Sequence, residues 1–206
     1  DEISACLNNP AATAERLARY DKAIEQFREG RDLAKRTGAA RNAVQALLNI
    51  AQVHSRKGAL GPAWNTAQEA LTEAEELNEG RLVGQAFEQL GQLSRHIGDP
   101  GAAEDFLTRS LAQFAELEDE RKQAEVRCNL NFLRLPFGSA QEWAQATQTV
   151  GGLEELGLRE IARWFWAELA LATGDPEDCE RWVAKATEGG ANVHLELMTD
   201  FARLRM

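Results

Sequence analysis

The sequence predicts an all-α protein, a solenoid of stacked antiparallel helix pairs, and two observations support this prediction. The first is a repeat. Gly58, Gly98 and Gly138 stand 40 residues apart, and so do Leu71 and Leu111. Self-similarity at one fixed period is typical of proteins built from stacked units. The second is composition, because a hydrophobic content of 44% that is rich in Ala and poor in Val, Thr and Tyr suits helices packed on helices rather than a sheet.

We expect four to five repeats in a single superhelical domain that covers residues 1–206. The expected parts are a partial N-terminal unit (1–38), a first repeat (39–78), a second repeat (79–118), a degenerate third repeat (119–157), a short fourth repeat (158–189) and a C-terminal capping helix (190–206). In such an array each unit buries its apolar face against its neighbours, so the length sets only the number of units.

The two middle repeats show one pattern twice. In each, apolar residues at helical spacing predict a first helix, and a similar stripe predicts a second helix after a turn that contains glycine. The first turn covers residues 58–61. The second is Gly98-Asp99-Pro100, which supplies an N-cap residue and a proline at the first helical position.

The outer units follow the pattern less closely. Asn9 and Pro10 predict a helix start, and the helix that begins near Asp21 is expected to end before Gly38. In the third repeat Trp143 stands where the other repeats have alanine. The fourth repeat is followed by a last amphipathic stretch, 193–204, which we expect to cap the stack.

On these residues the chain resembles the tetratricopeptide repeat (TPR) family. The matching residues of the second repeat are Phe87, Leu90-Gly91, Gly98-Asp99, Ala103 and Ser110-Leu111. The resemblance implies a right-handed α-solenoid whose first helices line a concave binding surface. Because the period exceeds the usual 34 residues, the chain is most similar to the long-repeat proteins, namely kinesin light chains, Pins-type polarity adaptors and bacterial TPR regulators, whose shared activity is binding.

The resemblance places candidate binding residues on the first helix of each repeat. They are Gln45, Asn49, Gln52, Arg56, Gln85, Gln89, Gln92, Arg95, Asn129, Phe132, Trp164 and Phe165. A carboxamide offers two donors and an acceptor, so it can hold the N–H and C=O groups of a peptide backbone. By resemblance, Asn49, Gln89 and Asn129 would form an asparagine ladder with one position per repeat. The alternative is that these are ordinary solvated helix residues.

The run Arg163-Trp164-Phe165-Trp166 stands out on the first helix of the fourth repeat. Successive helix residues are about 100° apart, so three adjacent aromatic rings cannot enter one packing seam. If Trp166 packs inward, Trp164 and Phe165 face the groove and could anchor a partner side chain. The alternative is that the closing stretch 193–204 covers them.

Composition argues against several other functions. The net charge of −10 disfavours a nucleic-acid partner, since that affinity depends on clustered Lys and Arg. No catalytic motif and no paired cysteines are visible, so we expect neither an enzyme nor a metal or other cofactor. No apolar run approaches the about 20 residues that span a bilayer. The three widely spaced cysteines, Cys6, Cys128 and Cys179, suggest no disulfide framework, so we expect a cytoplasmic protein in a reducing setting.

The sequence thus predicts a protein–protein interaction scaffold that binds a peptide or helical segment of a partner in its groove. Arg56, Arg95 and His96 near the ends of the first helices favour a neutral or acidic peptide. The alternative function is a ligand-sensing or peptide-sensing regulatory module of a larger signalling protein or transcription regulator. A homo-oligomer is compatible with either function.

Overall fold

The computed structural model describes residues 20–134, 140–173, 181 and 182, and this part of the chain contains eight α-helices and no strand. The predicted all-α class is therefore confirmed. The expected helix start at Asn9-Pro10 and the expected capping helix at 190–206 lie outside the described residues.

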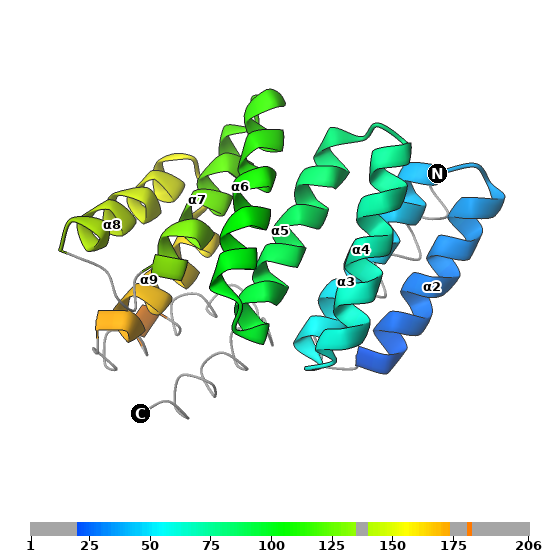
Figure 1. Ribbon diagram of the computed structural model, residues 1–206, viewed down its shortest axis with the longest axis horizontal. Helices are drawn as coiled ribbons and strands as arrows, with labels where there is room; N and C mark the ends of the chain where they lie inside the picture. The colour runs from blue at the N-terminus through cyan, green and yellow to red at the C-terminus, as the bar shows by residue number, and fades with distance from the viewer. Residues whose placement is uncertain (1–19, 135–139, 174–180, 183–206) are drawn as a thin grey trace. The chain divides into compact units, whose positions relative to one another are not determined.

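The chain divides between Glu118 and Asp119 into two compact units. The first unit contains α2 (Tyr20–Arg36), α3 (Ala40–Arg56), α4 (Leu60–Glu76), α5 (Gly80–Ile97) and α6 (Pro100–Glu116), which pack in chain order (Figure 1). The second contains α7 (Glu120–Arg134), α8 (Ala140–Glu155) and α9 (Arg159–Thr173). The division falls where the third repeat was expected to begin. The expectation of one continuous domain stays a prediction.

Short turns reverse the chain between successive helices of the first unit. Gly58 and Gly98 follow α3 and α5 with φ angles of 78° and 90°, a left-handed conformation that glycine adopts without steric cost. At the second of these turns Asp99 caps α6, because its Oδ1 accepts a hydrogen bond from the Ala102 N–H at 3.0 Å, and Pro100 opens the helix as predicted.

The two helix pairs of the first unit fill their interfaces in opposite ways. In the α3–α4 pair the first helix contributes Val44 and Ala51, and the second contributes only alanine at the facing positions. In the α5–α6 pair the equivalent positions of the first helix are glycines. A Cβ on Gly91 would lie 2.7 Å from Leu107 Cγ, and one on Gly84 would lie 2.9 Å from the Phe114 ring. Large side chains on α6 therefore fill the space that α5 leaves.

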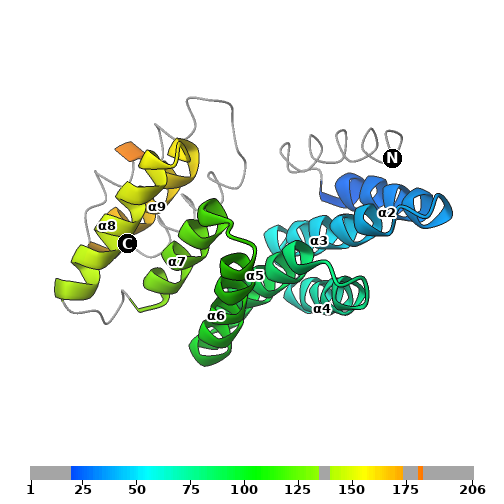
Figure 2. The same ribbon diagram turned by 90° about the horizontal axis from the view of Figure 1, so that it is seen from above.

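Within the first unit, α3 also contacts α5 directly, and α4 packs against both of them (Figure 2). The side chain of Gln89 on α5 links the two first helices, because its Nε2 donates a hydrogen bond to the Leu48 carbonyl oxygen at 3.0 Å. The first helices of successive repeats are thus direct neighbours, which brings their outward residues onto one surface.

Candidate functional site

Two matching rows of polar residues follow α3 and α5. In α3 the row is Arg41, Gln45, Asn49, Gln52 and Arg56, and in α5 it is Arg81, Gln85, Gln89, Gln92 and His96. We call these ten residues the polar stripes. Spacings of four, four, three and four residues keep each stripe on one side of its helix. All ten side chains are exposed or half-buried, so they form a surface and not part of the core.

The carboxamides of the polar stripes are partly engaged with one another and with the backbone. Gln45 Nε2 donates a hydrogen bond to Asn49 Oδ1 at 3.3 Å, and Gln89 Nε2 donates one to the Leu48 carbonyl oxygen. The Oε1 atoms of Gln85 and Gln89 are buried and accept no hydrogen bond from the described residues. The α5 stripe therefore has two carbonyl oxygens without a donor.

Charge separates the first helices from the second helices within this unit. Helix α3 contains no carboxylate, and the single carboxylate of α5, Glu88, is 9% exposed. Helix α4 contains no basic residue and four glutamates, Glu69, Glu73, Glu75 and Glu76. The surface of the polar stripes is thus basic and amide-rich, while the neighbouring α4 surface is acidic.

Two histidines at the polar stripes have lowered pKa values, which favours their neutral forms. Burial first, and then the positive charges of Arg28 and Lys57, lower the pKa of His54 below its ordinary value. At the far end of the α5 stripe, desolvation of the ring and then the charge of Arg95 lower the pKa of His96. The positive charge of the stripes at neutral pH therefore comes from their arginines.

Some candidate residues lie on the polar stripes, and one lies at their edge. The α3 and α5 candidates Gln45, Asn49, Gln52, Arg56, Gln85, Gln89 and Gln92 share the stripe surface. Arg95 is half-buried at the edge of the α5 stripe, beside His96. Sequence analysis missed Arg41 and Arg81, although the 40-residue period relates them just as it relates Gln45 to Gln85.

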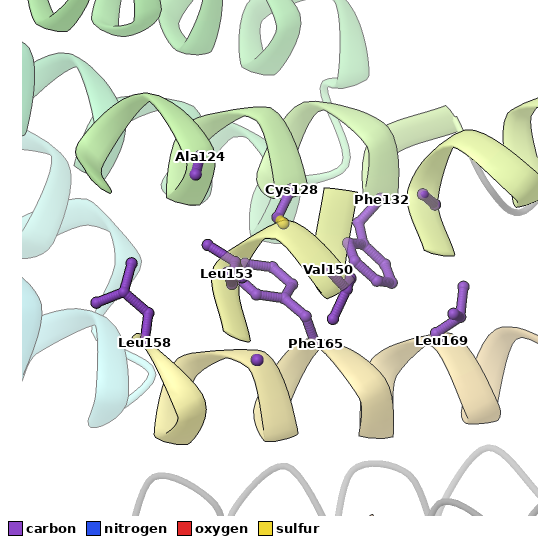
Figure 3. Packing of buried hydrophobic residues seen from close by; sticks show 10 residues of the cluster. Ala124, Cys128, Phe132, Val150, Leu153, Leu158, Phe165 and Leu169 are labelled. Carbon is purple, nitrogen blue, oxygen red and sulfur yellow. The ribbon is translucent and has the colours of Figure 1, made fainter. Parts of the chain in front are cut away.

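The remaining candidates lie in the second unit. Asn129 is half-buried on α7. Phe132 of α7 is only 7% exposed, and its ring stacks on Phe165 of α9 with 5.3 Å between centroids. Figure 3 shows both rings pointing into the core formed by α7, α8 and α9. The side chain of Trp164 lies outside the described part of the structure.

The orientation expected for the aromatic run differs from the one observed. Phe165 is 6% exposed in the core, while Trp166 is half-buried, donates from Nε1 to Glu154 Oε1 at 3.3 Å and stacks on Trp182. The cause is the phase of α9. The core residues of this segment recur at Leu158, Ala162, Phe165 and Leu169. That spacing places Phe165 within the core and Trp166 at its margin, where Trp166 is half-buried and packs against the cluster. The expected outward orientation of Phe165 is therefore wrong, whereas Trp166 does pack against the core cluster.

Two kinds of feature are absent from the residues that the structure describes. No group of three or more His, Cys, Asp or Glu side chains gathers there in a way that could hold a metal ion. None of the described helices has the length and apolar character needed to cross a membrane.

Comparison with solved structures identifies the helical arrangement. A Rap protein complexed with Competence and Sporulation Factor matches with a TM-score of 0.74 at 15% identity, over 99% of this chain. This chain spans 62% of that protein's length. A thermophilic TPR protein of Thermus thermophilus matches with a TM-score of 0.60 at 18% identity, over 98% of this chain and 99% of its own. The fold is a tetratricopeptide-repeat fold.

Other TPR structures agree with this identification. The TPR-like repeats of a putative kinesin light chain from Podospora anserina match with a TM-score of 0.57 at 10% identity, over 88% of this chain and 92% of that one. No family model and no curated protein matches the sequence. The TPR pattern is therefore carried by the helical geometry much more than by residue identity, and the long-repeat resemblance inferred from the sequence is confirmed at the level of fold.

Proposed function

We propose that the protein is an interaction scaffold and that the polar stripes of α3 and α5 bind a segment of a partner protein. The observation that carries the proposal is the duplicated stripe, in which basic residues flank three carboxamides on each of two contacting helices. Residues that served only to solvate a helix would not need the same order of side chains twice.

The hydrogen-bonding state of α5 supports the same proposal. A buried acceptor without a donor costs about 1–3 kcal/mol, and Gln85 and Gln89 each have one such oxygen within the described structure. The backbone N–H groups of a bound segment would supply a donor to Gln85 once its side chain turns outward, whereas Gln89 would have to exchange its hydrogen bond to the Leu48 carbonyl for one to the segment. Both glutamines are half-buried, so a change of rotamer is sufficient.

A second candidate function is a ligand-sensing regulatory module. The Rap protein, which was solved complexed with Competence and Sporulation Factor, supports this candidate, because this chain matches a part of it over almost the full length of this chain. A sensing module would change its internal stability on binding. Hydrogen exchange on the bound and free protein separates the two functions, because a scaffold gains protection only at the polar stripes, whereas a sensor also changes protection in α7 to α9.

The proposed binding is tested by selecting a random peptide library on three proteins, namely the wild type, Asn49→Ala/Gln85→Ala, and the control Asn65→Ala/Gln68→Ala. The control removes one Asn and one Gln from the exposed face of α4. We expect the wild type and the control to enrich the same peptides and the stripe variant to lose them at an unchanged melting temperature. Enrichment by all three proteins alike, or by none, contradicts the proposal. That the protein is not an enzyme stays a prediction.

A further inference from the structure

The spacing of the polar stripes bears on how a segment would lie on them. We propose that the bound segment is extended, runs along α3 and α5 rather than across successive repeats, and carries carboxylates near both ends. This inference rests on the proposed function and makes it specific, because it names the class of partner segment and its direction.

The first argument is the match between two spacings. Gln85 and Gln89 are four residues apart on one helix face, which is about 6 Å at 1.5 Å per residue. Alternate residues of an extended chain point to the same side and are about 6.6 Å apart. Consecutive glutamines of α5 therefore meet alternate residues of a segment that runs parallel to the helix. Gln45 and Asn49 of α3 offer the same spacing on the other side.

A segment that crosses the helices meets a less favourable spacing. Packed helix axes are about 8–10 Å apart, which an extended chain covers in about 2.4–3 residues. That spacing does not match the two-residue, about 6.6 Å repeat of backbone groups on one side of an extended chain. One carboxamide per repeat would then not meet equivalent backbone groups of the segment. The direction along the helices avoids this mismatch.

The second argument is charge at the two ends of the polar stripes. Each stripe begins with an arginine, Arg41 or Arg81, and ends with Arg56 or His96, about 22 Å away at the helical rise. An extended segment of about seven residues covers that length. Arg41 pairs with Glu79 at 3.1 Å, but its side chain is 65% exposed, so a carboxylate of the segment can displace this weak surface pair. The α3 stripe thus has an arginine at each end, and the α5 stripe has Arg81 at one end and Arg95 beside the uncharged His96 at the other. Carboxylates near both ends of the segment fit this distribution of charge.

The third argument is the division of hydrogen-bonding groups between the two helices. Asn49 Oδ1 accepts a hydrogen bond from Gln45 Nε2, which orients the Asn49 amide so that its nitrogen is the group we assign to donate to a carbonyl of the segment. On α5 the buried carbonyl oxygens of Gln85 and Gln89 lack a donor, and each would accept an N–H group of the segment once its side chain turns outward. Residues of an extended segment that face α5 would thus donate, and the alternate residues that face α3 would accept.

The test uses a fluorescent peptide with the highest enrichment in the library selection and measures its affinity by anisotropy. We expect Asn49→Ala and Gln85→Ala each to weaken binding about fivefold, the effect of one lost hydrogen bond. Asn129→Ala on α7 is the control for direction and is expected to leave affinity within about twofold. Asn49→Ala and Asn129→Ala weakening binding while Gln85→Ala has no effect would overturn the direction but keep the proposed function. No effect from any of the three overturns the proposed function itself.

The charge at the ends is tested with the same peptide and two further variants. Arg56→Gln is expected to weaken binding several-fold and to reduce its dependence on salt, since one charged contact is removed. Arg36→Gln, an exposed arginine at the end of α2, is the matched control and should leave both unchanged. Equal effects from the two variants, or an enriched peptide without acidic residues, would overturn the inference that the segment carries carboxylates near both ends.

Discussion

At the scale of single residues, the polar stripes combine structural and binding roles. Gln89 is the clearest case, since one of its amide atoms holds α3 and α5 together while the other lacks a donor within the described structure. The sequence identified Gln89 as a candidate binding residue from its register with Asn49. It could not show the hydrogen bond to Leu48, because that bond depends on how closely two helices from different repeats approach each other.

The structural role of Gln89 predicts a measurable loss of stability. Gln89→Met keeps the length of the side chain but removes the hydrogen bond to the Leu48 carbonyl, so we expect a loss of about 1 kcal/mol in the free energy of unfolding. Gln52→Met on the exposed side of α3 is the control and should change stability by less than about 0.5 kcal/mol. Urea titration measures both, and an equal loss in the two variants would mean that the Gln89 contact contributes nothing.

His54 predicts a dependence of stability on pH. Burial, Arg28 and Lys57 lower its pKa in the folded protein, so the unfolded chain takes up the proton first as the pH falls below about 6.5. This group therefore favours unfolding increasingly as the pH falls through that range. We expect His54→Gln to lose less stability than the wild type between about pH 7.5 and about pH 5.5. Parallel losses in urea titrations at both pH values would exclude this role for His54.

At the scale of helices, the sequence predicted where elements begin and end better than how they are turned. Asp99 and Pro100 identified the start of α6, because helix capping depends only on residues that are close together in the sequence. The rotation of α9 was not predictable in this way. Apolar residues occupy several sides of that helix, and only packing against α7 and α8 decides that Phe165 is buried in the core while Trp166 lies half-buried at its margin.

The α5–α6 pair predicts a compensating double substitution. Gly91→Ala places a methyl group 2.7 Å from Leu107 Cγ, which we expect to cost about 1–3 kcal/mol despite the better helix propensity of alanine. Leu107→Ala alone should cost about 2–5 kcal/mol through the cavity that it leaves. The double variant recreates the alanine pairing of α3 and α4, so its loss should fall at least about 1 kcal/mol short of the sum. Additive losses would show that the two positions do not share one space.

At the scale of the whole molecule, the described residues of each unit form local interfaces between neighbouring helices. The buried residues form separate clusters, such as that of Val44, Leu47 and Phe87 in the first unit and that of Val150, Leu153 and Phe165 in the second. The 40-residue period was sufficient to predict this arrangement, because each repeat packs against the repeats next to it in the sequence. The division of the chain after Glu118 was visible in the sequence only because the third repeat, which begins there, follows the repeat pattern poorly.

Separate clusters predict separate responses to core substitutions. Leu153→Ala in α8 and Leu47→Ala in α3 both remove a side chain that is at most 2% exposed, and each should cost about 2–5 kcal/mol locally. We expect faster hydrogen exchange in α7 to α9 for the first variant and in α2 to α5 for the second, as for nearest-neighbour repeat arrays. Equal acceleration across both units would show that the chain unfolds as one block.

The opposite filling of the two helix pairs also matters while the chain is being synthesised. Tandem units of similar sequence risk mispairing before the later unit has left the ribosome. If α5 took the place of α3 against α4, glycines would face alanines and leave voids, and if α3 took the place of α5 against α6, Val44 and Ala51 would collide with Leu107 and Phe114. Each first helix therefore fits only its own second helix, which disfavours an exchange of partners between the two helix pairs.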